Sequence, residues 1–270
     1  MGIVNVTPDS FSDGGQFDVG GGLSHDRATA HGLHQWSLGA DVLDVGGEST
    51  RPGSDPVSVT EELARVIPVV AALSAAGAVV SVDTSKPQVA REAIAAGAQI
   101  INDVTGLSSQ AMIDVAAETG VGVVIMHMQG TPKTMQEAPR YDDVVSEVRS
   151  ILAAAAERAQ VGGVAAGRIC IDPGIGFGKT FDHNLQLLDG LSALTDLGYP
   201  VLVGTSRKGF LGEILGGVPA SDRDQATGVT GAFAIERGAA VIRVHNVVAG
   251  THSARVADAM VRAARATEHE

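Results

Sequence analysis

The stretch "VVSVDTSKPQVAREAIAAGAQIINDV", residues 79–104, joins two short apolar runs through an alanine-rich segment. The runs at 79–83 and 99–104 are rich in Val and Ile, which predicts two strands. The segment between them, 86–97, has the amphipathic spacing of a helix. The whole stretch therefore predicts a strand, a helix and a second strand.

This unit repeats along the chain. Eight apolar runs predict strands, and amphipathic stretches such as 60–77 and 142–160 lie between them. The eight runs are GIVNV (2–6), DVLDVG (41–46), VVSVD (79–83), QIINDV (99–104), GVVIMH (122–127), RICID (168–172), PVLVG (200–204) and AVIRVH (240–245). Eight strands, each followed by a helix, predict an α/β protein folded as a (β/α)8 TIM barrel. A doubly wound open sheet is the alternative, which the uniform pattern and the count of eight disfavour.

Several helix-to-strand joints share the dipeptide Gly-Ala. Glycine suits the left-handed residue that ends many helices, and small residues let the helix end lie close to the next strand. The joints are Gly39–Ala40, Gly77–Ala78, Gly97–Ala98 and Gly238–Ala239. They predict structure rather than chemistry.

The composition is typical of a single globular domain. Of the 270 residues, 44% are hydrophobic and 19% are charged, and no linker or low-complexity segment divides them. We therefore predict one domain over residues 1–270, with the polar end RATEHE (265–270) as a disordered tail. No signal peptide or long apolar span appears, so we expect no membrane association. The single cysteine, Cys170, fits a buried thiol and favours a cytoplasmic location.

The formal net charge of −12 disfavours nucleic acid as a partner, because the long-range field repels polyanions. Aromatic residues make up only 3% of the chain, which leaves few side chains for stacking bases. A small anionic ligand remains compatible with this charge, because a local cluster of Arg and Lys overrides the global field.

The segment "IDPGIGFGKT", residues 171–180, looks at first like a phosphate-binding loop. That motif needs a glycine five residues before its Gly-Lys-Thr, because backbone amides there wrap the phosphates. This chain has Pro173 at that position, and proline has no amide hydrogen. The segment is therefore not a phosphate-binding loop, and a different role must explain Asp172.

Polar residues follow most of the predicted strands. In a TIM barrel the chemistry lies at the C-terminal ends of the strands. The residues found there are Asn5, Asp44, Asp83, Asn102, Asp103, His127, Asp172, Lys208, Arg243 and His245. Such a set of carboxylates, carboxamides and cations suits a flat, hydrogen-bonding heterocycle beside a phosphate group.

Two of the loops that follow strands are long and polar, at 5–15 and 46–54. Ordinary turn chemistry accounts for their Gly, Pro, Ser and Asp content. The exposed Phe11 in the first loop and Arg51 in the second favour a different interpretation, as lids over a site.

Seven segments together resemble the successive motifs of the dihydropteroate synthase family. They occur in that family's order and span the chain from Gly2 to beyond His245. The segments are GIVNVTPDSFSDGG, DVGGESTRPG, SVDTSKPQVA, INDVTG, DPGIGFGK, GTSRKGFLG and IRVHNV. The resemblance implies an enzyme, a transferase that joins 6-hydroxymethyl-7,8-dihydropterin pyrophosphate to p-aminobenzoate in folate synthesis. It also implies a dissociative substitution, inhibition by sulfonamides and a homodimer.

The resemblance places the pterin in a pocket made by Asp83, Asn102, Asp172 and Lys208. A carboxylate such as Asp172 accepts paired hydrogen bonds from a pterin edge, and Lys208 donates to ring acceptors. Met126 and Phe177 are expected to line the pocket, although core packing explains these two equally well.

For the leaving pyrophosphate, the resemblance implies contacts with Arg243 and His245, whose i, i+2 spacing puts them on one face of a strand. Asn5 is then the expected protein ligand of Mg²⁺, which takes its other ligands from water and phosphate oxygens. Asp83, Lys208 and Arg243 are the expected catalytic residues.

The resemblance implies that p-aminobenzoate is enclosed by Phe11, Thr50, Arg51 and Pro52. In the family its carboxylate meets the residue that follows the strand-seven lysine, often a serine. This chain has Gly209 there, so only the backbone amide remains for that contact.

Two rival functions share some of these residues. A pterin-dependent methyltransferase needs pterin-reading Asp and Asn side chains but not the Arg-x-His pair or the two lids. A non-catalytic pterin-binding barrel is the other rival, and the intact catalytic set disfavours it. His31 and His34 share a predicted helix face without further ligands nearby, so we interpret them as solvated rather than metal-binding.

Overall fold

The computed structural model describes residues 1–7, 24–50 and 53–267. Phe11, Arg51 and Pro52, and the end of the predicted tail at 268–270, lie outside the described residues.

All eight apolar runs form strands. The strands are β1 Gly2–Asn5, β2 Leu43–Gly46, β3 Val80–Asp83, β4 Ile100–Asp103, β5 Gly122–Met126, β6 Ile169–Asp172, β7 Leu202–Val203 and β8 Val241–Ile242. Strands β1 to β6 pair in sequence order as one parallel sheet, and β7 pairs with β8 as a second parallel sheet.

Two isolated parallel bridges join these sheets into a ring. Gly2 bridges Val244 beyond β8, and Ile171 in β6 bridges Val201 before β7. Backbone bonds support both joins, from Ile3 N to Val244 O at 3.0 Å and from Ile171 N to Pro200 O at 2.9 Å. The sequential strand order confirms the predicted TIM barrel and excludes the doubly wound alternative.

Strands β7 and β8 are shorter than the runs 200–204 and 240–245 that predicted them. Pro200 offers no N–H for a ladder bond, so the pairing of β7 begins only after it. Arg243 and His245 lie just beyond β8, where the backbone keeps a bond from Arg243 N to Val203 O at 3.0 Å and the bridge at Val244. This part of the ring has few ladder bonds of its own.

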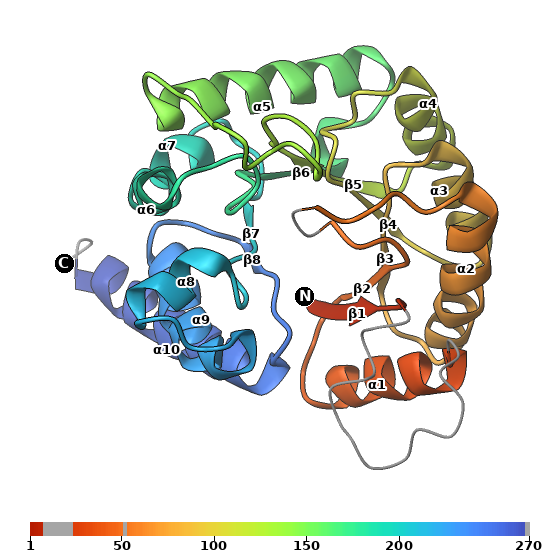
Figure 1. Cartoon of the computed structure of the whole chain (residues 1–270), viewed down its shortest axis with the longest axis horizontal. Coiled ribbons are helices and arrows are strands. Elements are labelled where there is room, and N and C mark those ends of the chain that lie inside the picture. Colours follow the sequence, from red (N-terminus) through yellow and green to blue (C-terminus); the bar gives the residue numbers. More distant parts are fainter. Residues whose placement is uncertain (8–23, 51–52, 268–270) are drawn as a thin grey trace.

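Helices form an outer layer around the strands, and α8, α9 and α10 lie together on one side (Figure 1). The helices are α1 His25–Ser37, α2 Val59–Ala75, α3 Pro87–Ala95, α4 Gln110–Thr119, α5 Val144–Val161, α6 Phe181–Asp189, α7 Ser192–Thr195, α8 Gly209–Ile214, α9 Asp224–Glu236 and α10 Val247–Thr267, with short 3₁₀ turns at Ala166–Arg168 and Ala220–Arg223. Helix α10 continues to Thr267, inside the segment predicted as a tail. No helix within the described ranges is long and apolar enough to cross a membrane.

The Gly-Ala joints end helices as predicted. The four glycines have φ values of 99°, 94°, 111° and 96°, in the left-handed region. At the first joint, Gly39 N donates to Trp36 O at 2.9 Å and Ala40 N to Gln35 O at 3.1 Å. This is the bonding pattern of a Schellman motif, which satisfies the last carbonyls of a helix.

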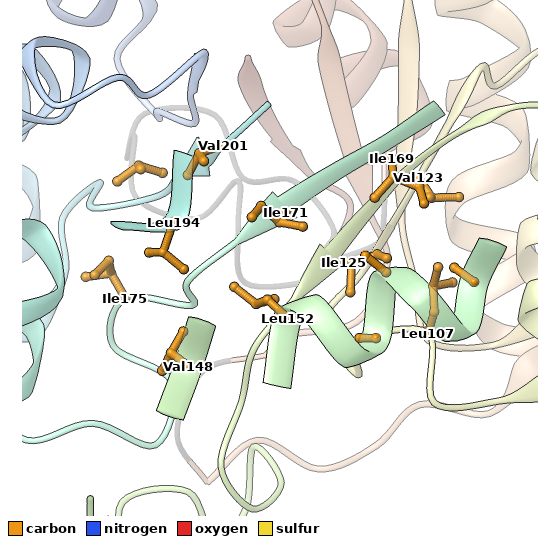
Figure 2. Close-up of a cluster of buried hydrophobic side chains, with 14 of the residues drawn as sticks. Leu107, Val123, Ile125, Val148, Leu152, Ile169, Ile171, Ile175, Leu194 and Val201 are labelled. Carbon is orange, nitrogen blue, oxygen red and sulfur yellow. The ribbon is translucent and has the colours of Figure 1, made fainter. Parts of the chain in front are cut away.

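Side chains alternate along each strand between the helices and the barrel interior. On β5 and β6, Ile125 and Ile171 are fully buried in a cluster that includes Val148 and Leu152 of α5 (Figure 2). On each strand, the residues directly before and after these isoleucines face the barrel interior. The same alternation sends Asp44, Asp83, Asn102, Met126 and Asp172 inward, so the core packing determines which polar residues meet at the mouth of the barrel.

Candidate active site

The strand register places several predicted site residues at one level of the barrel. Asn5 pairs with Gly46, Gly46 with Asp83, and Asp83 with Asn102 across four neighbouring strands. Asp44 lies two residues before Gly46 and therefore one interior layer deeper. These polar groups meet at the C-terminal end of the barrel, as predicted.

Arg243 connects the two layers. Its Nε donates to Asp44 Oδ2 at 2.6 Å, and its Nη2 donates to Asp83 Oδ2 at 2.8 Å. Asn102 Nδ2 donates to the same Asp44 oxygen at 3.0 Å. One guanidinium therefore holds two buried carboxylates apart in fixed geometry, and its third nitrogen, Nη1, makes no hydrogen bond within the described residues.

The sequence assigns no role to Asp44, and the structure places it inside β2 rather than at the end of that strand. It is fully buried, and its Oδ1 has no hydrogen-bond partner among the described residues. The only signal in the sequence was a charge inside the apolar run DVLDVG. Such a charge is buried only where a partner compensates it.

Burial raises the pKa of Asp83 to about 7, with a further increase from Asp44 and an opposing decrease from Arg243. Burial alone would lower the pKa of Arg243, but the attraction of Asp44 and Asp83 outweighs it and raises that pKa. The guanidinium therefore stays charged, whereas Asp83 titrates within the physiological range.

The loop after β6 folds back over the end of β5. Asp172 Oδ1 accepts a bond from Gly174 N at 2.7 Å, and His127 N donates to Asp172 O at 2.9 Å. Gly174 has a φ of 66°, and a Cβ there would lie 1.8 Å from His127 O. Only glycine fits this position, and the fit aims the Asp172 carboxylate into the barrel.

Asp172 and Lys208 are two further charged residues of the mouth, and each acts on the pKa of the other. Burial raises the pKa of Asp172 to about 6, while the Gly174 N–H and the nearby lysines oppose the shift. Burial lowers the pKa of Lys208 to about 8. Lys208 Nζ lies 3.9 Å from the centre of the Phe177 ring, a cation–π geometry that fixes both side chains. Met126 pairs with Asp172 across β5 and β6 and is 5% exposed.

Lys179, the lysine of the segment that looked like a phosphate-binding loop, is only 2% exposed. Its Nζ lies 2.9 Å from His127 Nδ1 and donates to Phe177 O at 2.8 Å. Burial lowers the pKa of His127 to about 3, so this imidazole is neutral. Lys179 thus stabilises its own loop through His127 and Phe177, which agrees with the rejection of a phosphate-binding loop.

Ser206 is a further site residue that we missed. Its Oγ lies 2.8 Å from His245 Nδ1 and accepts a bond from His245 N at 3.0 Å. The hydroxyl orients the imidazole from the chain segment that also carries Lys208. Its only sequence signal was its place in the TSRKG motif.

Other predicted residues do not join this network. Asp103 is buried, but its Oδ1 accepts two bonds from Thr105 at 2.7 Å each, so it closes a local turn. Thr50 is half-buried in the loop after β2. His31 and His34 are exposed on α1, and no cluster of three or more His, Cys, Asp or Glu side chains suited to a metal occurs in the described part of the chain.

Comparison with known proteins tests the resemblance directly. Residues 1–245 match the sequence profile of the family described as pterin binding enzyme. The Escherichia coli K12 protein named dihydropteroate synthase is 46% identical over 271 residues, which covers 100% of this chain and 94% of that protein. The chain belongs to the dihydropteroate synthase family. It is therefore a transferase of folate synthesis.

Two solved dihydropteroate synthases share the fold. The Xanthomonas albilineans enzyme with 4-aminobenzoic acid has a TM-score of 0.88 and 47% identity, over 96% of this chain and 91% of that chain. The Yersinia pestis enzyme in a sulfonamide drug complex has a TM-score of 0.89 and 43% identity, over 96% of this chain and 92% of that chain.

Proposed function

We propose that the barrel mouth joins 6-hydroxymethyl-7,8-dihydropterin pyrophosphate to p-aminobenzoate, with release of pyrophosphate and formation of 7,8-dihydropteroate. The observation that carries this proposal is the charge arrangement at the mouth. Arg243 is held by Asp44 and Asp83, and the charges of Asp172 and Lys208 lie close enough to act on each other. Membership of the dihydropteroate synthase family supports the same reaction.

The pterin-reading groups are Asp172, Asn102 and Lys208. The Asp172 carboxylate accepts paired bonds from the amino group and ring N–H of the pterin, and Asn102 both donates and accepts. Lys208 donates to ring acceptors while Phe177 stacks against its ammonium group. Met126 lines the buried side of the pocket. Substrate binding then replaces water around groups that the apo barrel already holds in place.

The reaction is a dissociative substitution. The C–O bond to pyrophosphate breaks with its electron pair on the leaving group, and the aniline nitrogen forms the new C–N bond before it loses its proton. Asp83, when ionised, stabilises the transient pterin methyl cation. Arg243, through its remaining Nη1, and His245 hold the departing polyanion. Lys208 keeps the ring in line for attack, which lowers the entropic part of the barrier.

The described residues fit Mg²⁺ through Asn5. Its side chain is half-buried at the end of β1 and forms no hydrogen bond with the described residues, so the carboxamide oxygen is available as a ligand. One protein oxygen suits Mg²⁺, which keeps several waters and binds phosphate oxygens. When bound, the ion would neutralise charge on the leaving pyrophosphate.

The family resemblance assigns the second substrate, p-aminobenzoate, to Phe11, Thr50, Arg51 and Pro52, of which the structure describes Thr50. Its carboxylate meets the backbone amide of Gly209, which is exposed at the start of α8. A 4-aminobenzoic acid complex of the related Xanthomonas enzyme supports this substrate class. Sulfonamides, as mimics of p-aminobenzoate, compete for the same space.

We further propose a cytoplasmic homodimer that pairs through α9 and α10. Four large apolar side chains on these two packed helices are exposed: Val229 by 70%, Phe233 by 41%, Val256 by 59% and Met260 by 69%. Several exposed apolar side chains on two packed helices favour burial against a second protein surface. Val229→Glu should convert the dimer to a monomer in light scattering, whereas Val161→Glu, at the exposed end of α5, should not.

The test of the function is pyrophosphate release from the pterin substrate with Mg²⁺, with and without p-aminobenzoate. Release coupled to dihydropteroate formation is the expected result. Pterin binding without release at saturation with both substrates would favour the non-catalytic barrel. The methyltransferase alternative is not retained, because the matched relatives described above are synthases.

A further inference from the structure

The bend between β7 and α8 has an unusual backbone at Arg207. Its φ is 58°, a left-handed conformation that the structure shows at only one other described non-glycine residue, Leu107. Left-handed backbone is unfavourable for an arginine and persists only where the surroundings impose it. Arg207 lies between Ser206, which orients His245, and Lys208, which packs on Phe177. The bend therefore determines where both of these site residues point.

The start of α9 imposes this conformation through three residues. Thr227 Oγ1 accepts from Arg207 N at 3.1 Å, and Arg223 Nη1 donates to the carbonyls of Arg207 and Lys208 at 3.1 and 3.2 Å. The Asp224 carboxylate accepts two hydrogen bonds from the Arg207 side chain, from Nε at 2.7 Å and from Nη2 at 2.9 Å. Such paired bonds fix direction as well as distance.

Asp224 also reaches the segment that follows β8. Its Oδ2 accepts a bond from Asn246 Nδ2 at 3.0 Å, and Asn246 Oδ1 accepts from Ala249 N at 3.1 Å in the first turn of α10. Asn246 directly follows His245. The same carboxylate therefore ties together the two chain segments that carry Lys208 and His245, in the part of the ring with the fewest ladder bonds.

We propose that Asp224 is a positioning residue for the transfer reaction: it acts through Arg207 and Asn246 to aim Lys208 and His245 at the pterin pyrophosphate. This inference rests on the proposed function, since it assigns Asp224 a role in that reaction. Asp224 contacts none of the groups assigned to the substrates.

The first experiment compares Asp224→Ala with Asp222→Ala. Asp222 is the matched control, because it is an exposed carboxylate two residues away that bonds only Ser221 among the described residues. We expect Asp224→Ala to lower kcat/KM for the pterin substrate about tenfold or more, at a temperature where circular dichroism shows it folded. The control should stay within about twofold of the unchanged enzyme, as surface substitutions do. Unchanged kcat/KM in Asp224→Ala would overturn the proposal.

A second variant separates positioning from general weakening of the fold. Glycine adopts a φ near 58° without strain, so Arg207→Gly in the Asp224→Ala background removes both the strain and the guanidinium that has lost its bonds to Asp224. We expect this double variant to regain about threefold or more of the lost kcat/KM, because a merely structural defect would not be relieved by a second deletion. A double variant that is as slow as Asp224→Ala, or slower, would contradict action through Arg207.

Hydrogen–deuterium exchange provides a readout that does not depend on turnover. Amides of residues 204–209 should exchange faster in Asp224→Ala than in the unchanged protein or in Asp222→Ala. Unchanged exchange in this segment would refute the proposal that Asp224 holds this bend. If the unchanged enzyme itself releases no pyrophosphate, the proposed function fails, and the exchange experiment still decides whether Asp224 holds the bend.

Discussion

The six-stranded and two-stranded parts of the barrel supply opposite charges to one site. Strands β1 to β6 have four or five residues each and present the carboxylates and carboxamides, Asp44, Asp83, Asn102 and Asp172. Strands β7 and β8 have two residues each and lead to the cations, Lys208 and Arg243. The regular half of the ring is thus the acidic half of the site, and the irregular half is the basic half.

The two sets are held in place by different means. A carboxylate at a strand end is positioned by the sheet register and by the alternation of side chains. Lys208 and Arg243 lie beyond the ladder and are positioned by contacts with other elements, Arg243 by Asp44 and Asp83, and Lys208 by Phe177. Each set of buried charges depends on the other, because an unpaired buried charge is costly.

The most severe disruption of this balance is Arg243→Ala. It leaves Asp44 and Asp83 facing each other in a buried space with no cation between them. We expect kcat to fall by about two to three orders of magnitude, as when a transition-state donor is lost. The free energy of unfolding should fall by about 3–5 kcal/mol, although the barrel still folds. Turnover and urea unfolding measure the two effects.

Two further variants serve as comparisons for Arg243→Ala. Arg91→Ala breaks an exposed pair with Glu118 and should change neither quantity appreciably. Asp83→Asn leaves Arg243 paired with Asp44, so we expect turnover to fall with a much smaller loss of stability. Normal turnover in either Arg243→Ala or Asp83→Asn would show that the role given to that residue is wrong.

Gly174→Ala attacks the acidic half through its backbone. The added Cβ would lie 1.8 Å from His127 O at a φ of 66°, so the loop that aims Asp172 must move. Gly198→Ala is the matched control, because it has a φ of 80° but no atom within 4 Å of the added Cβ. We expect the control to lose about 1 kcal/mol of stability from backbone strain. Gly174→Ala should lose more, together with pterin affinity measured by fluorescence; equal losses in the two variants would contradict the packing argument.

The same contrast explains how far the sequence could predict the site. The apolar runs predicted all eight strands, and the alternation along them brings Asp83, Asn102 and Asp172 to the interior as their strand-end positions suggested. Periodicity defines a side chain's face but not its partner across the barrel. The role of Asp44 therefore became visible only when Arg243, far away in sequence, was found bonded to it.

The irregular half was harder to predict for a related reason. Strands β7 and β8 pair with each other over two residues and join the rest of the ring through single bridges, one of which links Gly2 to Val244 at the other end of the chain. A left-handed arginine has no sequence signal at all, because arginine rarely adopts that conformation, so the bend at Arg207 was not foreseen. The burial of Lys179 could not be predicted from the sequence either. A lysine after Gly178 gives no sign that it will be buried under its own loop.

Protonation of the carboxylates should limit the activity at low pH, and deprotonation of Lys208 should limit it at high pH. In the proposed reaction Asp83 and Asp172 act as carboxylates, and burial raises their pKa values to about 7 and about 6. Lys208 acts as an ammonium, and burial lowers its pKa to about 8. A plot of kcat/KM against pH should therefore be bell-shaped, falling below pH 6–7 as the carboxylates gain protons and above pH 8 as Lys208 loses one. The basic limb, set by one group, should approach about tenfold per pH unit, whereas the acid limb should steepen toward about a hundredfold per unit below pH 6, where both carboxylates gain protons.

Asp83→Asn distinguishes the two carboxyl groups within that profile. With Asp83 removed, Asp172 alone controls the acid limb, so its midpoint should move down toward about 6 while the basic limb stays. An acid limb that keeps its position in the residually active variant would assign it to a different group.

The smallest expected effect is a gain, from Gly209→Ser at the start of α8 in the basic half. A Cβ at Gly209 would meet no atom within 4 Å, and its φ lies outside the left-handed region, so serine fits without strain. If the p-aminobenzoate carboxylate meets Gly209 as proposed, the new hydroxyl adds a hydrogen bond to it beside that of the backbone amide. A net hydrogen bond of about 0.5–1.5 kcal/mol corresponds to a KM for p-aminobenzoate that is roughly two- to tenfold lower. The KM for the pterin substrate should not change.

Gly209→Ala, which fills the same space without the hydroxyl, should leave both KM values unchanged. An equal gain from alanine would mean that a stiffer helix start, not the hydroxyl, improves binding.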